Sequence, residues 1–199
     1  MTAAAALRPF TAPPPCSAPA VAAVTRALEA LVGLPYDGEP VDQLQHALQC
    51  ADHARRAGAD RELVLAALLH DVSRSPHVAG EPFDGGPVHH GEQSARWLAP
   101  LFGERVARLA AAHVDAKRYL VAVDPAYAAG LTDVSAWTLR AQGGPMTTDE
   151  AAAFEGRPDW EAAVMLRRWD DLAKDPESEV PGLEAYVEEL RLGAVASAA

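Results

Sequence analysis

Histidine and carboxylate side chains recur along the chain at positions expected to be buried or to face a site. They are His46, the adjacent pair His70-Asp71, His90, His113 and Asp170. An imidazole beside a carboxylate is costly to bury unless something charged satisfies both, and a metal ion does so. Imidazole and carboxylate ligands suit iron among other metals. The set therefore predicts a metal centre, and its size leaves room for two ions.

The remaining histidines are expected on the surface or in loops. They are His53, His77 and His89. His89 stays a rival ligand, because it directly precedes His90 and the sequence alone does not say which of the two faces the site.

Two cations accompany the candidate ligands at helical spacing. Lys117 follows His113 by one helical turn, and Arg167 precedes Asp170 by one turn, so each is expected to point toward the metals. Lysine and arginine neutralise phosphate-like anions through charge-assisted hydrogen bonds. The pattern thus predicts an anion-binding pocket beside the metal centre.

The elements that must position these residues are helices. The stretch from Leu63 to Leu69 is apolar on nearly every side, which is typical of a central, buried helix, and His70-Asp71 lies at its end. Asp60 can cap that helix. A helix over 40–57 carries His46 on a side of its own, and its water-facing side is expected to hold Asp42, Gln45, Gln49, Asp52 and Arg56.

Further helices are expected in the rest of the chain. The pattern predicts helices over about 19–32, from His90 to a break at Gly103, over the following segment with His113, around Ser135 and Thr138, from about 158 through Asp170, and over 181–192. Residues 73–88 are rich in proline and glycine, and are expected to form a long loop of the kind that often covers a site.

Composition limits the class of protein. The 199 residues are 49% hydrophobic and lack alternating strand patterns, so we expect one all-α domain over 20–193, between a disordered Ala/Pro-rich tail over 1–19 and a flexible tail over 194–199. A net charge of −11 argues against nucleic acid as a partner. No apolar run approaches the roughly 20 residues of a membrane span. Two cysteines, Cys16 and Cys50, fit the reducing cytoplasm.

Longer runs resemble one family. The order of the candidate ligands resembles the HD-domain superfamily. The runs QLQHALQCADHARRAGADRELVLAALLHD, HVDAKRYLV and QGGPM, and the helix around Asp170, are similar to the HD-domain mixed-valent diiron oxygenases of phosphonate catabolism. The similarity covers about residues 34–186. It implies an all-α HD-domain helical bundle with a dinuclear metal centre in the core, two iron ions as Fe(II)/Fe(III), and O2 as co-substrate.

The resemblance also implies an activity and roles for the ligands. Such enzymes cleave the C–P bond of a small 1-hydroxyphosphonate and release phosphate. One metal would be held by His46, His70, Asp71 and Asp170, and the other by Asp71, His90 and His113, so that Asp71 bridges both. A shared carboxylate is usual for two cations about 3.5–4 Å apart.

The substrate side of the site is carried over in the same way. Ser135 and Thr138 match positions that line the pocket in the family. Tyr36 and Glu39 match a pair that gates the substrate, the tyrosine covering the vacant iron and the acid meeting an amine. Glu39 thus implies an ammonium group on the substrate, as in 2-amino-1-hydroxyethylphosphonate.

One residue departs from the family. Relatives read HDxxH, whereas this chain has Arg74 in place of the last histidine. Arginine stays protonated and cannot act as a general base, so either the base is dispensable, or His77 replaces it, or the substrate differs. Arg74 is then a candidate contact for an extra acidic group.

Two other functions remain open from the sequence. A metal-dependent HD phosphohydrolase acting on a phosphate ester needs the same ligands. A metal-free HD module for binding or regulation would not need all six positions filled. The similarity outside the ligands, with Tyr36 and Glu39, favours the oxygenase.

Overall fold

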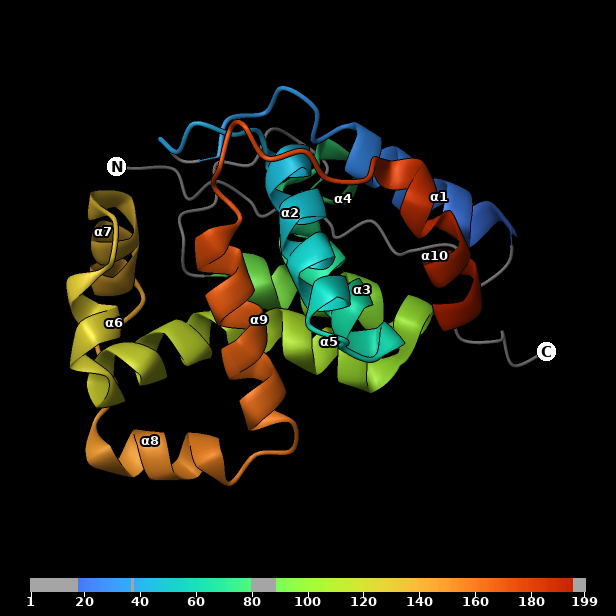
Figure 1. Ribbon diagram of the computed structural model, residues 1–199. Coiled ribbons are helices and arrows are strands. Elements are labelled where there is room, and N and C mark those ends of the chain that lie inside the picture. Colours follow the sequence, from blue (N-terminus) through green and yellow to red (C-terminus); the bar gives the residue numbers. More distant parts are fainter. Residues whose placement is uncertain (1–17, 37, 80–88, 195–199) are drawn as a thin grey trace, which may run out of the picture.

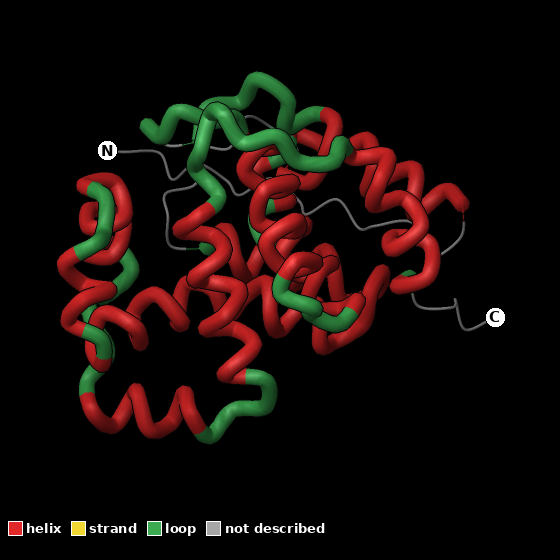
Figure 2. Tube along the Cα trace, viewed as in Figure 1, coloured by secondary structure: helices red, strands yellow, loops and turns green. Residues whose placement is uncertain are grey.

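The computed structural model describes residues 18–36, 38–79 and 89–194. In chain order the helices are α1 (Ala18–Glu29), α2 (Gln43–Arg56), α3 (Arg61–Leu69), the 3-10 helix η1 (Val72–Arg74), α4 (Pro76–Ala79), α5 (His90–Val123), α6 (Pro125–Ala129), α7 (Asp133–Ala141), α8 (Thr148–Glu155), α9 (Trp160–Leu172), the 3-10 helix η2 (Leu183–Tyr186) and α10 (Val187–Gly193). In these ranges the sole β-type pairing is an isolated bridge between Pro35 and Asp42. Figure 2 shows helices joined by loops. The all-α prediction is confirmed.

Helix α3 is the centre of the bundle. Every residue from Leu63 to Leu69 is buried, as its all-round apolar sequence predicts. The helix lies between α2 and α5, and α9 packs along α5 and against α2 (Figure 1). Asp60 caps α3 by accepting a hydrogen bond from the Leu63 amide at 3.0 Å. These four helices carry the candidate metal ligands at the point where they meet.

Helix α5 runs through two predicted helices. Gly103 has non-helical backbone angles, φ 85° and ψ 171°, so α5 consists of two helical segments joined at a kink there. A positive φ is strained for residues with a side chain, so the glycine makes the bend possible. His90 and His113 therefore lie on two helical segments on opposite sides of the kink, and the predicted break at Gly103 is confirmed.

Some local predictions are wrong. Gln49 and Asp52 of α2 were expected to face water but are buried, with 1% and 7% of their surface exposed. The Gln49 side-chain amide forms two hydrogen bonds with the backbone of Asp175. It donates to the carbonyl at 2.7 Å and accepts from the N–H at 3.1 Å. The predicted loop over 73–88 begins with η1 and α4, while its remainder, residues 80–88, lies outside the described residues.

The remaining elements cover the periphery. Helices α6, α7 and α8 form one end of the molecule, and α1 with α10 form the other (Figure 1). A capping box between Thr147 and Glu150 starts α8. Within the described ranges, none of the helices is both long and apolar enough to cross a membrane. Residues 1–17 and 195–199, where tails were predicted, lie outside the described residues, so the domain limits stay a prediction.

Candidate metal centre and substrate pocket

The structure brings the six candidate ligands together as two neighbouring groups. His46 of α2, His70 at the end of α3 and Asp170 of α9 form the first group. The second consists of Asp71, which follows His70, with His90 and His113 of α5, and within each group the ligand atoms lie within 4.8 Å of one another. All six side chains are buried. His89, the rival of His90, is exposed and belongs to neither group.

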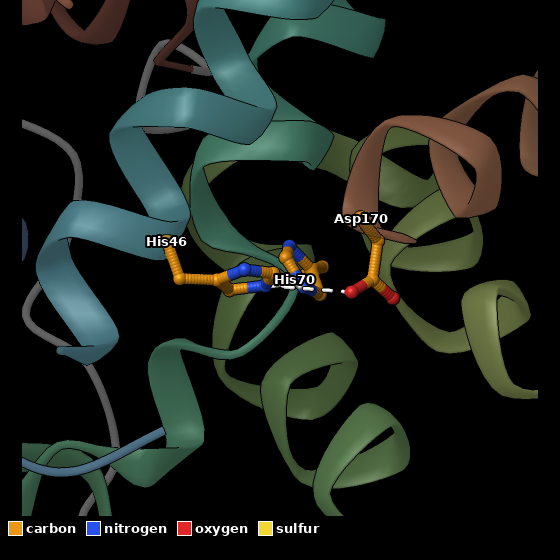
Figure 3. A group of neighbouring side chains, drawn as sticks. All are labelled: His46, His70 and Asp170. Atoms are coloured by element: carbon orange, nitrogen blue, oxygen red, sulfur yellow. Dashed lines mark hydrogen bonds and ion pairs between the residues drawn. The ribbon is translucent and has the colours of Figure 1, made fainter. Parts of the chain in front are cut away.

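Backbone carbonyls fix the ring nitrogens that face the first group. His46 Nδ1 lies 2.8 Å from the Ala173 carbonyl, and His70 Nδ1 lies 2.9 Å from the Ala67 carbonyl. A carbonyl accepts only from N–H, so each Nδ1 carries the proton and each Nε2 presents a lone pair. The two Nε2 atoms are 3.2 Å apart, and His46 Nε2 is 3.5 Å from Asp170 (Figure 3). Lone pairs that converge in this way call for a cation between them.

Proton binding by the His46 and His113 rings is disfavoured in the fold. Burial lowers the pKa of His46 to about 4, and burial followed by repulsion from His90 lowers the pKa of His113 well below its usual value. The neutral imidazole is the form that binds metals. The His113 ring is oriented like the others, with Nδ1 2.5 Å from the Ala110 carbonyl.

The second group contains an unsatisfied carboxylate oxygen. Asp71 Oδ1 is buried and has no hydrogen-bond partner among the described residues. It lies 3.4 Å from His90 Nε2 and 3.8 Å from His113 Nε2, while Oδ2 lies 3.8 Å from His70 Nε2 of the first group. An orphaned buried anion is expensive unless a cation meets it. One oxygen of Asp71 thus faces each group, which fits a carboxylate shared by two ions.

The donor set fits iron. All six donors are imidazole nitrogens or carboxylate oxygens, and the buried thiol of Cys50 does not belong to either group. Nitrogen and oxygen ligands of this kind suit iron, manganese and zinc. The residues could therefore hold two divalent or trivalent ions, and they do not select among these metals.

A small cavity of about 40 Å³ borders the ligands. It is lined by the residues that the sequence assigns to substrate, namely Tyr36, Glu39, Arg74, Lys117, Ser135, Thr138 and Arg167. A larger cavity of about 390 Å³ lies against α5, α8 and the start of α9, but none of the six candidate ligands lines it. The smaller cavity is therefore the one that adjoins the ligand groups.

Lys117 is a buried cation in this cavity. Its ammonium donates to the Thr138 hydroxyl at 2.7 Å, and only 3% of the residue is exposed. No carboxylate of the described residues lies within 4 Å of it, in contrast to Lys174, which approaches two. Burial, with a smaller contribution from Arg167, lowers the pKa of Lys117 to about 7. A desolvated ammonium without an acid partner is suited to an anionic ligand.

Arg167 is more fully engaged than the sequence suggests. It donates to Asp170 Oδ2 at 2.7 Å, to the Tyr127 hydroxyl at 3.0 Å and to both oxygens of Asp171. Burial opposes ionisation of Asp170, but Arg167 and the three nearby histidines together hold the pKa of Asp170 well below its usual value. The structure thus gives Arg167 the task of orienting Asp170 at the edge of the cavity.

Tyr36 lies over the first group. Its ring stacks on His46 with 3.9 Å between centroids and 16° between planes, and its hydroxyl donates to Asp170 Oδ1 at 3.1 Å. Burial, reinforced by Asp170, raises the pKa of Tyr36 well above its usual value, so the hydroxyl remains a donor. A ligand that approaches this group must displace the phenol from Asp170.

Glu39 is paired within the chain. Its Oε1 accepts from the Thr132 hydroxyl at 2.9 Å and lies 3.2 Å from the ammonium of Lys174. Sequence reasoning missed Lys174, although it follows Asp171 and Asp170 by three and four residues and so falls on their side of the chain. Arg74, in η1, lines the same cavity, whereas His77 of α4 is exposed and does not line it.

Comparisons with known proteins agree with this arrangement. The HD domain family model matches residues 44–175. The chain is 43% identical over 154 residues to hydroxymethylphosphonate dioxygenase of Gimesia maris, covering 76% of each chain. It is 35% identical over 148 residues to the glycine-betaine-forming [1-hydroxy-2-(trimethylamino)ethyl]phosphonate dioxygenase of Leisingera caerulea, covering 73% of this chain and 76% of the relative.

A third relative has no assigned activity. It is an uncharacterized protein of Acanthamoeba polyphaga mimivirus, 31% identical over 158 residues, which are 77% of this chain and 72% of the viral one. With the match over 44–175 and the two dioxygenases aligned over most of their length, the chain belongs to the HD-domain family, in the branch that contains these phosphonate dioxygenases.

Proposed function

We propose that the protein is an iron-dependent oxygenase that uses O2 to cleave the carbon–phosphorus bond of a small 1-hydroxyphosphonate and releases phosphate. Two relatives named as phosphonate dioxygenases support an oxygenase acting on phosphonates. The cofactor in this proposal is a pair of iron ions, Fe(II)/Fe(III), and Asp71 is the carboxylate they share.

The observation that carries the proposal is the position of Lys117. This buried ammonium without an acid partner lines the same small cavity as four of the candidate metal ligands, namely Asp71, His90, His113 and Asp170. An HD site meant for a neutral substrate would gain nothing from a desolvated cation there. A phosphonate gives Lys117 the counter-charge that the described residues do not supply.

The chain's own groups divide the work of binding. Lys117 and the hydroxyls of Ser135 and Thr138 would hold the phosphonate oxygens, since all three line the cavity. Thr138 accepts from Lys117 and donates to the Ser135 carbonyl at 3.1 Å, so its hydroxyl orients the ammonium. Arg167 would keep Asp170 ionised and in place for the metal. These assignments would give each of these hydrogen-bond donors around the small cavity a role in binding.

Tyr36 would act as the cover of the site. Its hydroxyl occupies Asp170 and its ring lies on His46, so the first group is shielded from water before substrate enters. Exclusion of water protects a reactive site from unproductive chemistry. The substrate's hydroxyl and phosphonate oxygens would replace this contact as they bind.

Bound iron would supply the Lewis acidity and the one-electron chemistry with O2 that these side chains lack. The reaction then balances without a further reductant. For hydroxymethylphosphonate, the substrate dianion and one O2 contain the atoms and charge of one formate and one dihydrogen phosphate.

The test is phosphate release by the iron-loaded protein with and without O2. We expect release from a 1-hydroxyphosphonate in air, none under anaerobic conditions, and one O2 consumed per phosphate. EPR of the resting protein should show a coupled Fe(II)/Fe(III) signal that changes when substrate is added. Oxygen-independent hydrolysis of a phosphate ester with Mn(II) or Mg(II), without such a signal, would instead establish the phosphohydrolase.

A further inference from the structure

We propose that Lys174 sets the substrate range of this site, by occupying Glu39 and so selecting a 1-hydroxyphosphonate that carries no amine. The inference rests on the proposed function and narrows it. Glu39 is the acid that, by resemblance, would meet a substrate ammonium. In this chain, its charge is already neutralised by an ammonium of the protein.

The contacts of Lys174 define an internal ion pair in the wall of the cavity. Its Nζ lies 3.2 Å from Glu39 Oε1, 3.3 Å from Ser135 Oγ and 3.8 Å from Asp171 Oδ1. Both partners of the Glu39–Lys174 pair have 12% of their side chain exposed. A pair so shielded from water is screened far less than a surface pair, so its charges strongly affect any third charge that enters.

A substrate ammonium would meet two obstacles. It would compete with Lys174 for Glu39, which also accepts from Thr132 at 2.9 Å. It would also stand close to the ammonium of Lys174 and feel its repulsion. Specificity often depends on a repulsive element against the wrong ligand as much as on contacts to the right one.

The volume of the cavity also favours a substrate without an amine. The cavity of about 40 Å³ corresponds to about three water-sized positions. A phosphonate head group and a single hydroxylated carbon suit such a space better than a longer ammonium-bearing chain. Arg74 and Lys117 line the cavity as well, so its cations favour an anionic ligand without positive charge of its own.

The two named relatives differ in the same property. The one with 43% identity is named for hydroxymethylphosphonate, which has no amine, and the one with 35% identity for a trimethylamino compound. The Glu39–Lys174 pair suggests that this chain shares the preference of the first relative for a substrate without an amine. The contacts of the pair support this preference independently of the sequence identity.

The experiment compares hydroxymethylphosphonate with 2-amino-1-hydroxyethylphosphonate in the iron-loaded protein. We would measure kcat/KM from phosphate release, and the Kd of each compound by anaerobic calorimetry, which reads binding apart from turnover. The variants are Lys174→Met, which frees Glu39, and Lys174→Arg, which keeps a cation there. Arg168→Met removes a more exposed cation from the neighbouring turns of α9 and serves as the matched control, since it does not line the cavity.

We expect the unchanged protein to prefer hydroxymethylphosphonate by about tenfold or more, because a buried charge left without its partner typically costs at least that much. Lys174→Met should shift the ratio toward the amine by about tenfold or more, and Lys174→Arg and Arg168→Met should keep the original order. Adding Glu39→Gln to Lys174→Met should remove the gain, because the freed carboxylate is its cause. If Lys174→Met does not fold, Lys174→Gln makes the same comparison.

The outcomes separate the two proposals. Equal or better use of the amine compound by the unchanged protein, or a ratio that Lys174→Met leaves alone, overturns the role of Lys174 and leaves the oxygenase intact. Failure to release phosphate from either compound in air, by a protein loaded with iron, overturns the oxygenase itself and with it this inference.

Discussion

Replacing Lys117 with methionine should stabilise the metal-free protein while weakening its affinity for phosphonate. Methionine keeps the apolar stem of the side chain and removes the buried charge. In the fold, burial lowers the pKa of Lys117 from 10.5 to about 7. Each tenfold change in an ionisation constant corresponds to about 1.4 kcal/mol, so the charged form costs up to about 5 kcal/mol. Relaxation and the lost bond to Thr138 reduce the expected gain to about 2–4 kcal/mol at pH 6.

The stability difference between Lys117→Met and the unchanged protein should depend on pH. Between pH 7 and 10.5 the unfolded chain holds the Lys117 proton while the folded chain has released it. The free energy of unfolding of the unchanged protein therefore rises with pH over this range through this group, and that of Lys117→Met does not. The advantage of the variant should be complete below pH 7 and smaller by about 3 kcal/mol at about pH 9.5, where it is close to zero.

The assay is urea unfolding of chelator-treated protein at about pH 6 and about pH 9.5, with Arg140→Met as control because Arg140 is exposed. The control should change stability by no more than about 0.5 kcal/mol at either pH. In the metal-loaded protein, the same Lys117→Met should weaken hydroxymethylphosphonate by about a hundredfold, since it removes a buried charge that pairs with the ligand. A variant no more stable than the parent at the lower pH, or a difference independent of pH, would refute the view of Lys117 as a desolvated cation without an acid.

Three further predictions concern positions around the site. Gly91→Ala places a Cβ 3.3 Å from the His113 ring, which must then shift, so we expect the second ion to bind about tenfold more weakly in a metal titration; full occupancy at unchanged affinity would contradict this. Tyr36→Phe removes the hydroxyl that competes for Asp170, so calorimetry should show tighter binding of hydroxymethylphosphonate by up to about tenfold, and weaker binding would argue that the hydroxyl contacts the substrate. Arg105→Ala removes a guanidinium that bonds to three carboxylates at the starts of α3 and α9, and urea unfolding should lose about 1–3 kcal/mol; an unchanged midpoint would mean that these exposed pairs contribute nothing.

The helical core could be predicted from the sequence because its signals are local. The apolar run from Leu63 to Leu69 requires burial on every side, and capping by Asp60 follows from its position before that run. A histidine on an apolar stripe, such as His113, is recognisable for the same reason. The Ala110 carbonyl of the same helix meets its Nδ1, so its buried Nε2 still needs a partner of another kind.

The residues that the sequence did not reveal depend on partners far along the chain. Gln49 has the spacing of a surface residue, and it is buried because the backbone at Asp175 uses both ends of its amide. Glu39 and Lys174 are 135 positions apart, so nothing in either local pattern indicates that they form a pair. Helical periodicity reports which side of a helix faces inward, but it does not report which distant group lies there.

The short segment after α9, residues 173–175, affects both the candidate metal centre and the substrate pocket. The carbonyl of Ala173 orients His46, the next residue Lys174 occupies Glu39, and Gln49 fastens the backbone at Asp175. A backbone shift that moved Lys174 away from the cavity would also move the carbonyl that orients His46, a candidate metal ligand. A change of the side chain at position 174 is therefore expected to alter substrate preference alone, whereas an insertion or deletion in 173–175 should also disturb the candidate metal centre.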